Sequence, residues 1–256
     1  MTTIVYEQRI QVKKQYDVLV AGAGPAGICA AVAAARQGAK VALIERYGIV
    51  GGNLTAGYVG PILGMVSKGT LRDEVVKLLG VPHNDMIGVT GKAHDFEQAK
   101  RILADFVNHP NIDVYLQSSV FDVIKEGSAL KGLIIASNEG HFALMGKVVI
   151  DASGDAIVSY LAGATIEKGR EDGLMQPVTL EFTIDGVDEQ KGVICIGDVD
   201  EVKLGEDRFL DFCKRCAGEG KLPEKLAAVR LHPTTKVGER QVNTTQVNGV
   251  DMTQVD

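Results

Sequence analysis

A glycine-rich turn between a short apolar strand and an alanine-rich helix constrains this chain more than any other feature. Residues 16–21 (YDVLVA) predict a strand buried on both faces of a parallel sheet. The sequence GAGPAG follows at 22–27, and residues 28–37 predict a helix. Residues 40–45 predict a second strand that ends in a glutamate. Together these segments predict one βαβ unit of about thirty residues.

The spacing of the glycines in this turn favours a bound dinucleotide. Gly22 permits the sharp turn out of the strand, and Gly27 lets helix and strand pack closely. Gly24 leaves room for a pyrophosphate at the helix N-terminus, where the helix dipole favours an anion. Pro25 suits the first helical turn. Glu45 is placed to accept hydrogen bonds from ribose hydroxyls, and its charge disfavours the 2′-phosphate of NADP.

A second glycine-rich loop follows the glutamate, where an NAD dehydrogenase would continue with another helix and strand. Residues 45–57 are ERYGIVGGNLTAG. With this loop the chain resembles FAD-dependent oxidoreductases of the glutathione-reductase-like superfamily, whose Gly-Gly loop runs along the pyrophosphate and ribityl chain of an extended FAD. The resemblance implies FAD as the cofactor. Over these first sixty residues it implies the cofactor-binding residues Gly22, Gly24, Pro25, Ala26, Gly27, Glu45, Arg46, Gly51, Gly52, Asn53 and Thr55.

Two later segments extend the resemblance. Residues 147–156 (KVVIDASGDA) are similar to the family's returning strand, which ends in an Ala-Thr-Gly type of turn near the cofactor, with Ser153 here in place of Thr. Residues 113–124 are similar to the strand whose backbone meets the adenine, which implies Val120. The turn adds Ala152, Ser153, Gly154 and Asp155 to the cofactor-binding set. Ser153 lacks the GxSxG context of a nucleophilic serine.

The predicted fold class is α/β, a Rossmann-like parallel sheet of the FAD/NAD(P)-binding type with a small helical insertion and an incomplete α+β substrate domain. Residues 1–163 are expected to form the FAD-binding domain. That domain is discontinuous, over 1–61 and 111–163, and residues 62–110 form the helical insertion. Residues 164–256 are expected to form a substrate or cap region.

The smaller elements follow from periodicity and turn residues. Apolar residues at i, i+3 and i+4 spacing give residues 95–109 a helix with one core-facing side. The remaining expectations are helices at 71–79, 209–217 and 224–229, short strands between 113 and 137 with turns at 126–127 and 131–132, and strands at 177–184 and 193–196.

The C-terminal end departs from the family pattern. Relatives return a strand and a helix to the FAD domain, and the N-terminus of that helix lies by the flavin ring. Residues 242–256 are polar and contain no second glycine motif. The expectation is therefore a chain that lacks the C-terminal part of such a flavoprotein. It would act as a homo-oligomer or with a partner chain that supplies the missing segment.

Candidate catalytic and metal-binding residues are few. Arg230, His232 and Arg240 are grouped basic residues that could bind a carboxylate or move a proton, although surface charges and a loop histidine explain them more simply. Cys213 and Cys216 have the spacing of a zinc or thiol redox site, but they fall in a predicted helix without a second ligand pair. No metal site is predicted, and no catalytic residue is assigned.

Composition limits the partners and the location. The net charge of −6 gives no electrostatic reason to expect nucleic acid. Residues 18–35 are uncharged and long enough to suggest a membrane span. Three glycines and a proline within six positions favour a buried strand, turn and helix instead, so no membrane partner is expected. Four cysteines in 256 residues favour a reducing compartment, and the cytoplasm is predicted.

These observations predict an FAD-dependent oxidoreductase that transfers hydride between a small-molecule substrate and the flavin. One alternative is a truncated or split flavoprotein fragment that binds the dinucleotide without catalysis. The other is an NAD-binding dehydrogenase, against which the second glycine-rich loop and the returning strand both count.

Overall fold

The computed structural model contains two compact units, each described here by itself. It describes residues 3–60, 62, 69–80, 93–190, 203–204, 207–223 and 230–247. Unit 1 comprises Met1–Gly52 and Leu103–Ile166, and unit 2 comprises Asn53–Ile102 and Glu167–Asp256. The domain boundaries expected from the sequence stay predictions.

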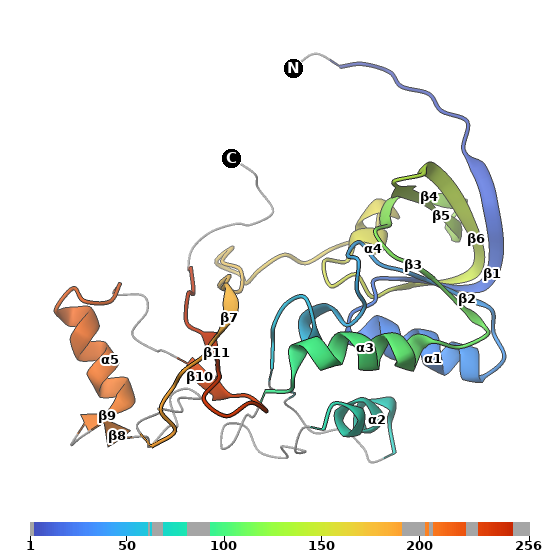
Figure 1. Ribbon diagram of the computed structural model, residues 1–256. Helices are drawn as coiled ribbons and strands as arrows, with labels where there is room; N and C mark the ends of the chain where they lie inside the picture. The colour runs from blue at the N-terminus through green and yellow to red at the C-terminus, as the bar shows by residue number, and fades with distance from the viewer. Residues whose placement is uncertain are drawn as a thin grey trace. The chain divides into compact units, whose positions relative to one another are not determined.

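Unit 1 is built on a six-stranded sheet with the strand order β3-β2-β1-β6-β5-β4 (Figure 1). Four neighbouring strands run parallel: β3 (Ile112–Tyr115), β2 (Val41–Ile44), β1 (Gln11–Ala21) and β6 (Gly140–Asp151). Two antiparallel strands, β5 (Ala129–Ser137) and β4 (Ser119–Glu126), extend the sheet from β6. The predicted α/β class with a Rossmann-like parallel sheet is confirmed.

The sequence pattern explains the centre of this sheet. All four residues of β2 are buried, as expected for a strand covered on both faces. Helix α1 (Pro25–Arg36) packs against β1 and β2. Its buried positions include Ile28, Ala31 and Ala35, which recur at helical spacing along one side. The βαβ unit predicted from residues 16–45 is confirmed.

A second apolar cluster joins the parallel strands to the antiparallel extension. It includes Leu19 of β1, Ile44 of β2, Ile135 of β5, Leu144 of β6 and Val158 of helix α4 (Ile157–Leu161). Each fully buried side chain of this size contributes about 1.5–3 kcal/mol relative to an exposed one. The cluster therefore couples β4–β6 to the βαβ unit and fixes the position of the turn that follows β6.

Two sequence expectations for this sheet were wrong. The strand expected at 113–124 is divided into β3 and β4, because the chain bends between them and Gln117 adopts a φ of 48°. The turn expected at 131–132 lies inside β5. A Cβ on Gly132 would stand 2.5 Å from the Leu144 carbonyl oxygen, so this glycine permits close strand pairing, not a turn. The turn at 126–127 is confirmed.

Unit 2 contains an antiparallel sheet with the order β10-β11-β7. Its strands are β7 (Glu181–Ile184), β10 (Arg230–Pro233) and β11 (Arg240–Asn243), and β7 is shorter than the strand expected at 177–184. The other elements of the unit are α2 (Leu71–Leu78), β8 (Lys203–Leu204), β9 (Asp207–Arg208) and α5 (Phe209–Gly218).

The helices expected at 71–79 and 209–217 are confirmed. Helix α3 (Phe96–Val107), which spans the boundary between the two units, confirms the expectation at 95–109. The elements expected at 193–196 and 224–229 lie outside the described residues. Among the described helices, none has the length and apolar character needed to cross a membrane.

Candidate functional site

Three strand ends meet at one edge of the unit 1 sheet. Because β2, β1 and β6 are parallel neighbours, their carboxyl ends lie side by side, followed by Glu45, Gly22 and Ala152 respectively. Ligands of open α/β sheets bind outside the carboxyl ends of the strands. The segments that the sequence predicts for cofactor binding in unit 1 are therefore mostly brought together at this edge.

Two glycines of the first loop are required by close packing. Gly22 has a φ of +94°, and a Cβ there would stand 2.4 Å from the Ala152 carbonyl oxygen. A Cβ on Gly27 would stand 1.8 Å from the Gly22 carbonyl oxygen. Both distances are shorter than real Cβ contacts, so no side chain fits at either position. The loop and the turn after β6 consequently form one tightly packed feature.

Gly24 differs from both of them. An added Cβ there would meet nothing within 4 Å, and its φ of −70° is ordinary for any residue. Neither packing nor backbone strain therefore explains a glycine at this position. The close approach of a ligand to the backbone would explain it, and this is the role that the sequence predicts for Gly24.

The N-terminus of α1, which directly follows Gly24, presents backbone N–H groups that have no acceptor within the helix. Gly24 is the N-cap and has no side chain to cap the helix, and Pro25 has no N–H. Ala26 and Gly27 occupy the first turn, where backbone N–H groups have no acceptor within the helix. These donors and the positive end of the helix dipole favour a phosphate group at this point.

Glu45 holds the first loop in place. Its side chain is 5% exposed, and its two carboxylate oxygens accept hydrogen bonds from the N–H groups of Ala23 (2.8 Å) and Tyr47 (2.9 Å). A carboxylate has about four lone-pair positions, so two acceptor positions are left for ribose hydroxyls. The sequence predicted only the ribose contact. The bonds to the backbone, which add a loop-fixing role, were missed.

The second glycine-rich loop rests on the first. The Gly51 N–H donates to the Ala23 carbonyl oxygen at 2.7 Å. A Cβ on Gly52 would stand 2.8 Å from the Cα of Gly24, so the two loops touch at their glycines. Asn53 and Thr55 belong to unit 2, where Asn53 is exposed and Thr55 is fully buried.

Ser153 is engaged in a network at the end of β6. Its hydroxyl donates to Asp151 at 2.6 Å and accepts a hydrogen bond from the Ile157 N–H at 3.0 Å. The N–H and hydroxyl of Ser159 donate to the other Asp151 oxygen, both at 2.8 Å. Burial alone would raise the pKa of Asp151, but the hydrogen bonds from Ser153 and Ser159 together hold it below its ordinary value. Ser153 thus shapes the turn that contains Gly154, whose φ is +81°.

Arg46 and Asp155 form an ion pair across the strand-end edge. They follow β2 and β6, and Nη1 lies 3.6 Å from Oδ2. The guanidinium also lies 5.0 Å from the centre of the Tyr47 ring. Both members of the pair are more than half exposed, so it contributes at most about 1 kcal/mol. Either side chain can therefore exchange this contact for one with a ligand at little cost.

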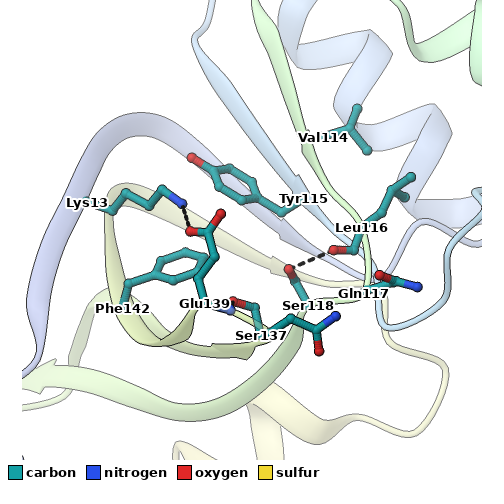
Figure 2. Close-up of a pocket in the computed structure, with 10 residues that line it drawn as sticks. Lys13, Val114, Tyr115, Leu116, Gln117, Ser118, Ser137, Glu139 and Phe142 are labelled. Carbon is teal, nitrogen blue, oxygen red and sulfur yellow. Dashed lines mark hydrogen bonds and ion pairs between the residues drawn. The ribbon is translucent and has the colours of Figure 1, made fainter.

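A second region of unit 1 holds a pocket of about 280 Å³, which is lined by residues of β1, β3, β5 and β6 and by the segments that follow β3 and β5 (Figure 2). Tyr115 and Phe142 give it aromatic walls, and a 2.6 Å ion pair joins Lys13 to Glu139 beside them. Ser118 of the lining precedes Val120 on β4. No residue predicted to bind the cofactor lines this pocket, so we do not assign it to the pyrophosphate.

The sheet of unit 2 separates the three basic candidates. Strand alternation places Arg230 and His232 on one face and Arg240 on the other. Arg240 is 1% exposed and forms a two-pronged ion pair with Glu189, at 2.9 and 3.0 Å. The hydrogen bonds from Arg240 and then from the Gly238 N–H lower the pKa of Glu189 to about 2. Arg240 therefore has a structural role, because it holds Glu189 through both carboxylate oxygens.

Comparison with known proteins identifies the family. The family described as FAD dependent oxidoreductase matches residues 17–256. The chain belongs to this family. FAD as the cofactor is thereby confirmed, as is the predicted resemblance to FAD-dependent oxidoreductases.

Relatives of this chain match it over part of their length. A soluble pyridine nucleotide transhydrogenase of Mycobacterium bovis (strain BCG / Pasteur 1173P2) is 34% identical over 82 residues, which is 32% of this chain and 16% of the relative. A digeranylgeranylglycerophospholipid reductase of Picrophilus torridus is 29% identical over 155 residues, 54% of this chain and 39% of the relative. The chain thus matches well under half of either relative.

A solved structure supports the fold of this family member. The p-nitrophenol 4-monooxygenase PnpA from Pseudomonas putida DLL-E4 has a TM-score of 0.56 with 11% identity. The similarity covers 94% of this chain and 59% of the monooxygenase. At this identity the similarity concerns the fold.

The sequence also gave no signal for His94, a buried histidine of unit 2. Its Nδ1 lies 3.1 Å from the Gly60 carbonyl oxygen, and its Nε2 lies 2.6 Å from the Leu54 carbonyl oxygen. The side chain is fully buried and joins two loops that are forty residues apart. A lone histidine in the sequence does not reveal such a bridging role, because both acceptors are backbone atoms.

Proposed function

We propose that this chain binds FAD at the carboxyl ends of β1, β2 and β6, and that it acts as part of an oxidoreductase that transfers hydride between a small-molecule substrate and the flavin. Gly24 carries the proposal, because its backbone faces open space at an uncapped helix N-terminus. The residues present at this edge fit a dinucleotide.

Each predicted residue then has a definite task. The N–H groups of Ala26 and Gly27 bind the pyrophosphate, and the remaining acceptor positions of Glu45 bind the ribose. Gly51 and Gly52 let the second loop approach the cofactor, and the backbone at Val120 meets the adenine. The other residues proposed to contact FAD are Arg46, Asn53, Thr55, Ala152, Ser153, Gly154 and Asp155. FAD supplies the redox chemistry when bound, and the protein orients it and excludes water.

The proposal extends to the setting of the reaction. The matched relatives are longer than the matched region. The oxidoreductase activity of the whole protein and its use of a small-molecule substrate are therefore part of what we propose. We also propose a cytoplasmic location, for which the modest number of cysteines is the support. Cell fractionation with an antibody against the protein tests the location, and recovery in an exported fraction would contradict it.

The decisive test compares two glycine-to-alanine variants. Gly24→Ala and Gly218→Ala both place a methyl group where nothing lies within 4 Å, and neither glycine has a positive φ. We expect the free energy of unfolding of each variant to lie within about 0.5 kcal/mol of the wild-type value. Gly24→Ala should weaken FAD binding at least about tenfold, equivalent to about 1.4 kcal/mol, whereas Gly218→Ala should leave it unchanged.

The measurement is a titration of FAD followed by visible absorption and flavin fluorescence. A wild-type protein that gains no flavin spectrum would contradict the proposal for this chain. Equal FAD affinity in wild type and Gly24→Ala would show that the cofactor does not approach the first loop. A gain of binding for NAD instead of FAD would favour the dehydrogenase alternative.

A further inference from the structure

Six polar side chains share one face of the three-stranded sheet in unit 2. We call this set the polar face. The strand register gives its members in two rows of directly opposed residues: Arg230, Asn243 and Glu181, then His232, Gln241 and Thr183. Opposed residues of an antiparallel sheet, and residues two apart along a strand, point to the same side. The opposite face carries Leu231, Val242 and Phe182 in its middle row.

The polar face is covered at its centre. Gln241 has no exposed surface, and His232 is 5% exposed. On the opposite face Val242 is 6% exposed and Phe182 is 38% exposed, so the central strand β11 is covered on both sides. Antiparallel sheets commonly expose the polar residues of one face, so the burial of Gln241 and His232 departs from the usual arrangement. A departure of this kind indicates that the polar groups serve a purpose other than hydration of the surface.

Hydrogen-bond acceptors on the polar face are left without donors. The Gln241 side-chain N–H donates to Glu181. The Gln241 Oε1 and the Asn243 Oδ1 are buried and have no hydrogen-bond partner among the residues that the structure describes. Native proteins satisfy nearly all such atoms with protein, water or ligand. Burial raises the pKa of Glu181 to about 7.

The two ends of the first row of the polar face differ chemically. Arg230 lies at one end of the first row and Glu181 at the other, with Asn243 between them. Neighbouring strands are about 4.8 Å apart, so the two ends are separated by about 10 Å. Within the part of the chain that the structure describes, Arg230 has no ion pair. A ligand that matches this row presents an anion at one end and hydrogen-bond donors along the rest.

We propose that the first row of the polar face, which is partly exposed, binds a small hydroxylated carboxylic acid, with its carboxylate at Arg230 and its hydroxyl groups at Asn243 and Glu181. The carboxylate fits the guanidinium, and a hydroxyl supplies the donor that the Asn243 amide oxygen lacks. As the substrate class of the flavin reaction this inference rests on the proposed function. As a binding face it stands on the geometry of unit 2 alone.

The first experiment compares three six-carbon probes on the wild-type protein. Gluconate has both hydroxyls and a carboxylate, sorbitol has hydroxyls alone, and hexanoate has a carboxylate alone. Saturation-transfer NMR and calorimetry should show gluconate binding at least tenfold more tightly than either of the others. No binding of gluconate, or equal binding of all three probes, overturns the proposal.

Variants then locate the binding. Asn243→Leu removes an acceptor that has no donor in the folded protein, so its melting temperature should equal or exceed that of the wild type. Its gluconate affinity should fall at least tenfold. Arg230→Gln should abolish the preference for gluconate over sorbitol. Phe182→Leu, on the opposite face, is the matched control and should bind gluconate as the wild type does.

Each contrary result has a definite meaning. Unchanged gluconate binding in both Asn243→Leu and Arg230→Gln overturns the proposal. A lower melting temperature of Asn243→Leu overturns it as well, because the amide then has a structural partner. FAD binding, measured in parallel by absorption, separates the two proposals. Loss of gluconate binding with FAD retained concerns the polar face, and absence of FAD binding concerns the proposed function.

Discussion

The strand-end edge of unit 1 and the polar face of unit 2 treat their polar groups in opposite ways. At the strand-end edge, Glu45 is tied to the backbone of two loops, and the loops themselves are bonded to each other. On the polar face, the amide oxygens of Gln241 and Asn243 remain without donors. One region is complete except for the space that a ligand fills. The other lacks hydrogen bonds that a ligand supplies.

The difference teaches how each region can be changed without loss of the fold. At the strand-end edge Glu45 supports the loops as well as the proposed ribose contact, so its substitution should alter folding and binding together. On the polar face the unmet groups already cost stability, so their removal should weaken binding without lowering stability. Four further predictions test this contrast, in order of decreasing effect.

Gly27→Ala should have the largest effect. Its methyl group would overlap the Gly22 carbonyl oxygen at 1.8 Å, and that atom belongs to backbone held by β1. We expect a loss of about 3 kcal/mol or more in the free energy of unfolding, measured by urea denaturation. Gly24→Ala, which is expected to leave the free energy of unfolding unchanged, is the control within the same loop. A Gly27→Ala protein as stable as the wild type would show that the loop can shift freely.

Glu45→Ala should reduce stability and FAD affinity together. The N–H groups of Ala23 and Tyr47 would lose their acceptor at a buried site, and the ribose would lose its own. We expect about 1–3 kcal/mol from the free energy of unfolding and a similar loss in binding free energy. Urea denaturation and FAD titration measure the two effects. Weaker FAD binding at unchanged stability would confine Glu45 to the ribose.

Arg240→Gln should lower the melting temperature in a pH-dependent way. The pKa of Glu189 falls from an ordinary 4.5 to about 2 beside Arg240, so the folded state favours the ionised form. The stabilisation is therefore complete above pH 4.5 and disappears as the pH falls toward 2. Melting curves of both proteins between pH 7 and 2 should converge at the acid end. A constant difference across this range would assign the loss to packing.

Arg46→Gln should have the smallest effect on stability. Its ion pair with Asp155 is exposed, so the free energy of unfolding should change by less than about 1 kcal/mol. FAD affinity should fall, and the difference from the wild type should shrink in high salt because exposed charges are screened. FAD titrations at low and high salt measure this. A salt-independent difference would indicate a contact through the Tyr47 ring instead.

The sequence predicted the strand-end edge because its determinants are local. The strand, the three glycines, the helix and the glutamate of residues 16–45 are consecutive, and each has a separate physical reason. Reasoning from the local sequence was wrong at Gly132, where the glycine permits close pairing with the neighbouring strand β6. A glycine pattern alone does not distinguish a turn from close strand pairing.

The polar face was beyond sequence prediction for a different reason. Arg230 and His232 were noted, but Gln241 and Asn243 join them only through the register of β10 with β11, and Glu181 only through the register of β11 with the distant β7. Likewise, the partner of Arg240 is Glu189, fifty-one positions away. A shift of one residue in either pairing would move the whole set to the other side of the sheet. Such a site exists only once the sheet has formed.

The bonds between Glu45 and the first loop have a consequence for cofactor exchange. A loop that is already held in its binding conformation loses little conformational entropy when the dinucleotide arrives. FAD then binds a loop that is already formed. Differences in FAD affinity are therefore expected mainly in the rate of dissociation. Binding and release of FAD should therefore leave the conformation of this loop unchanged.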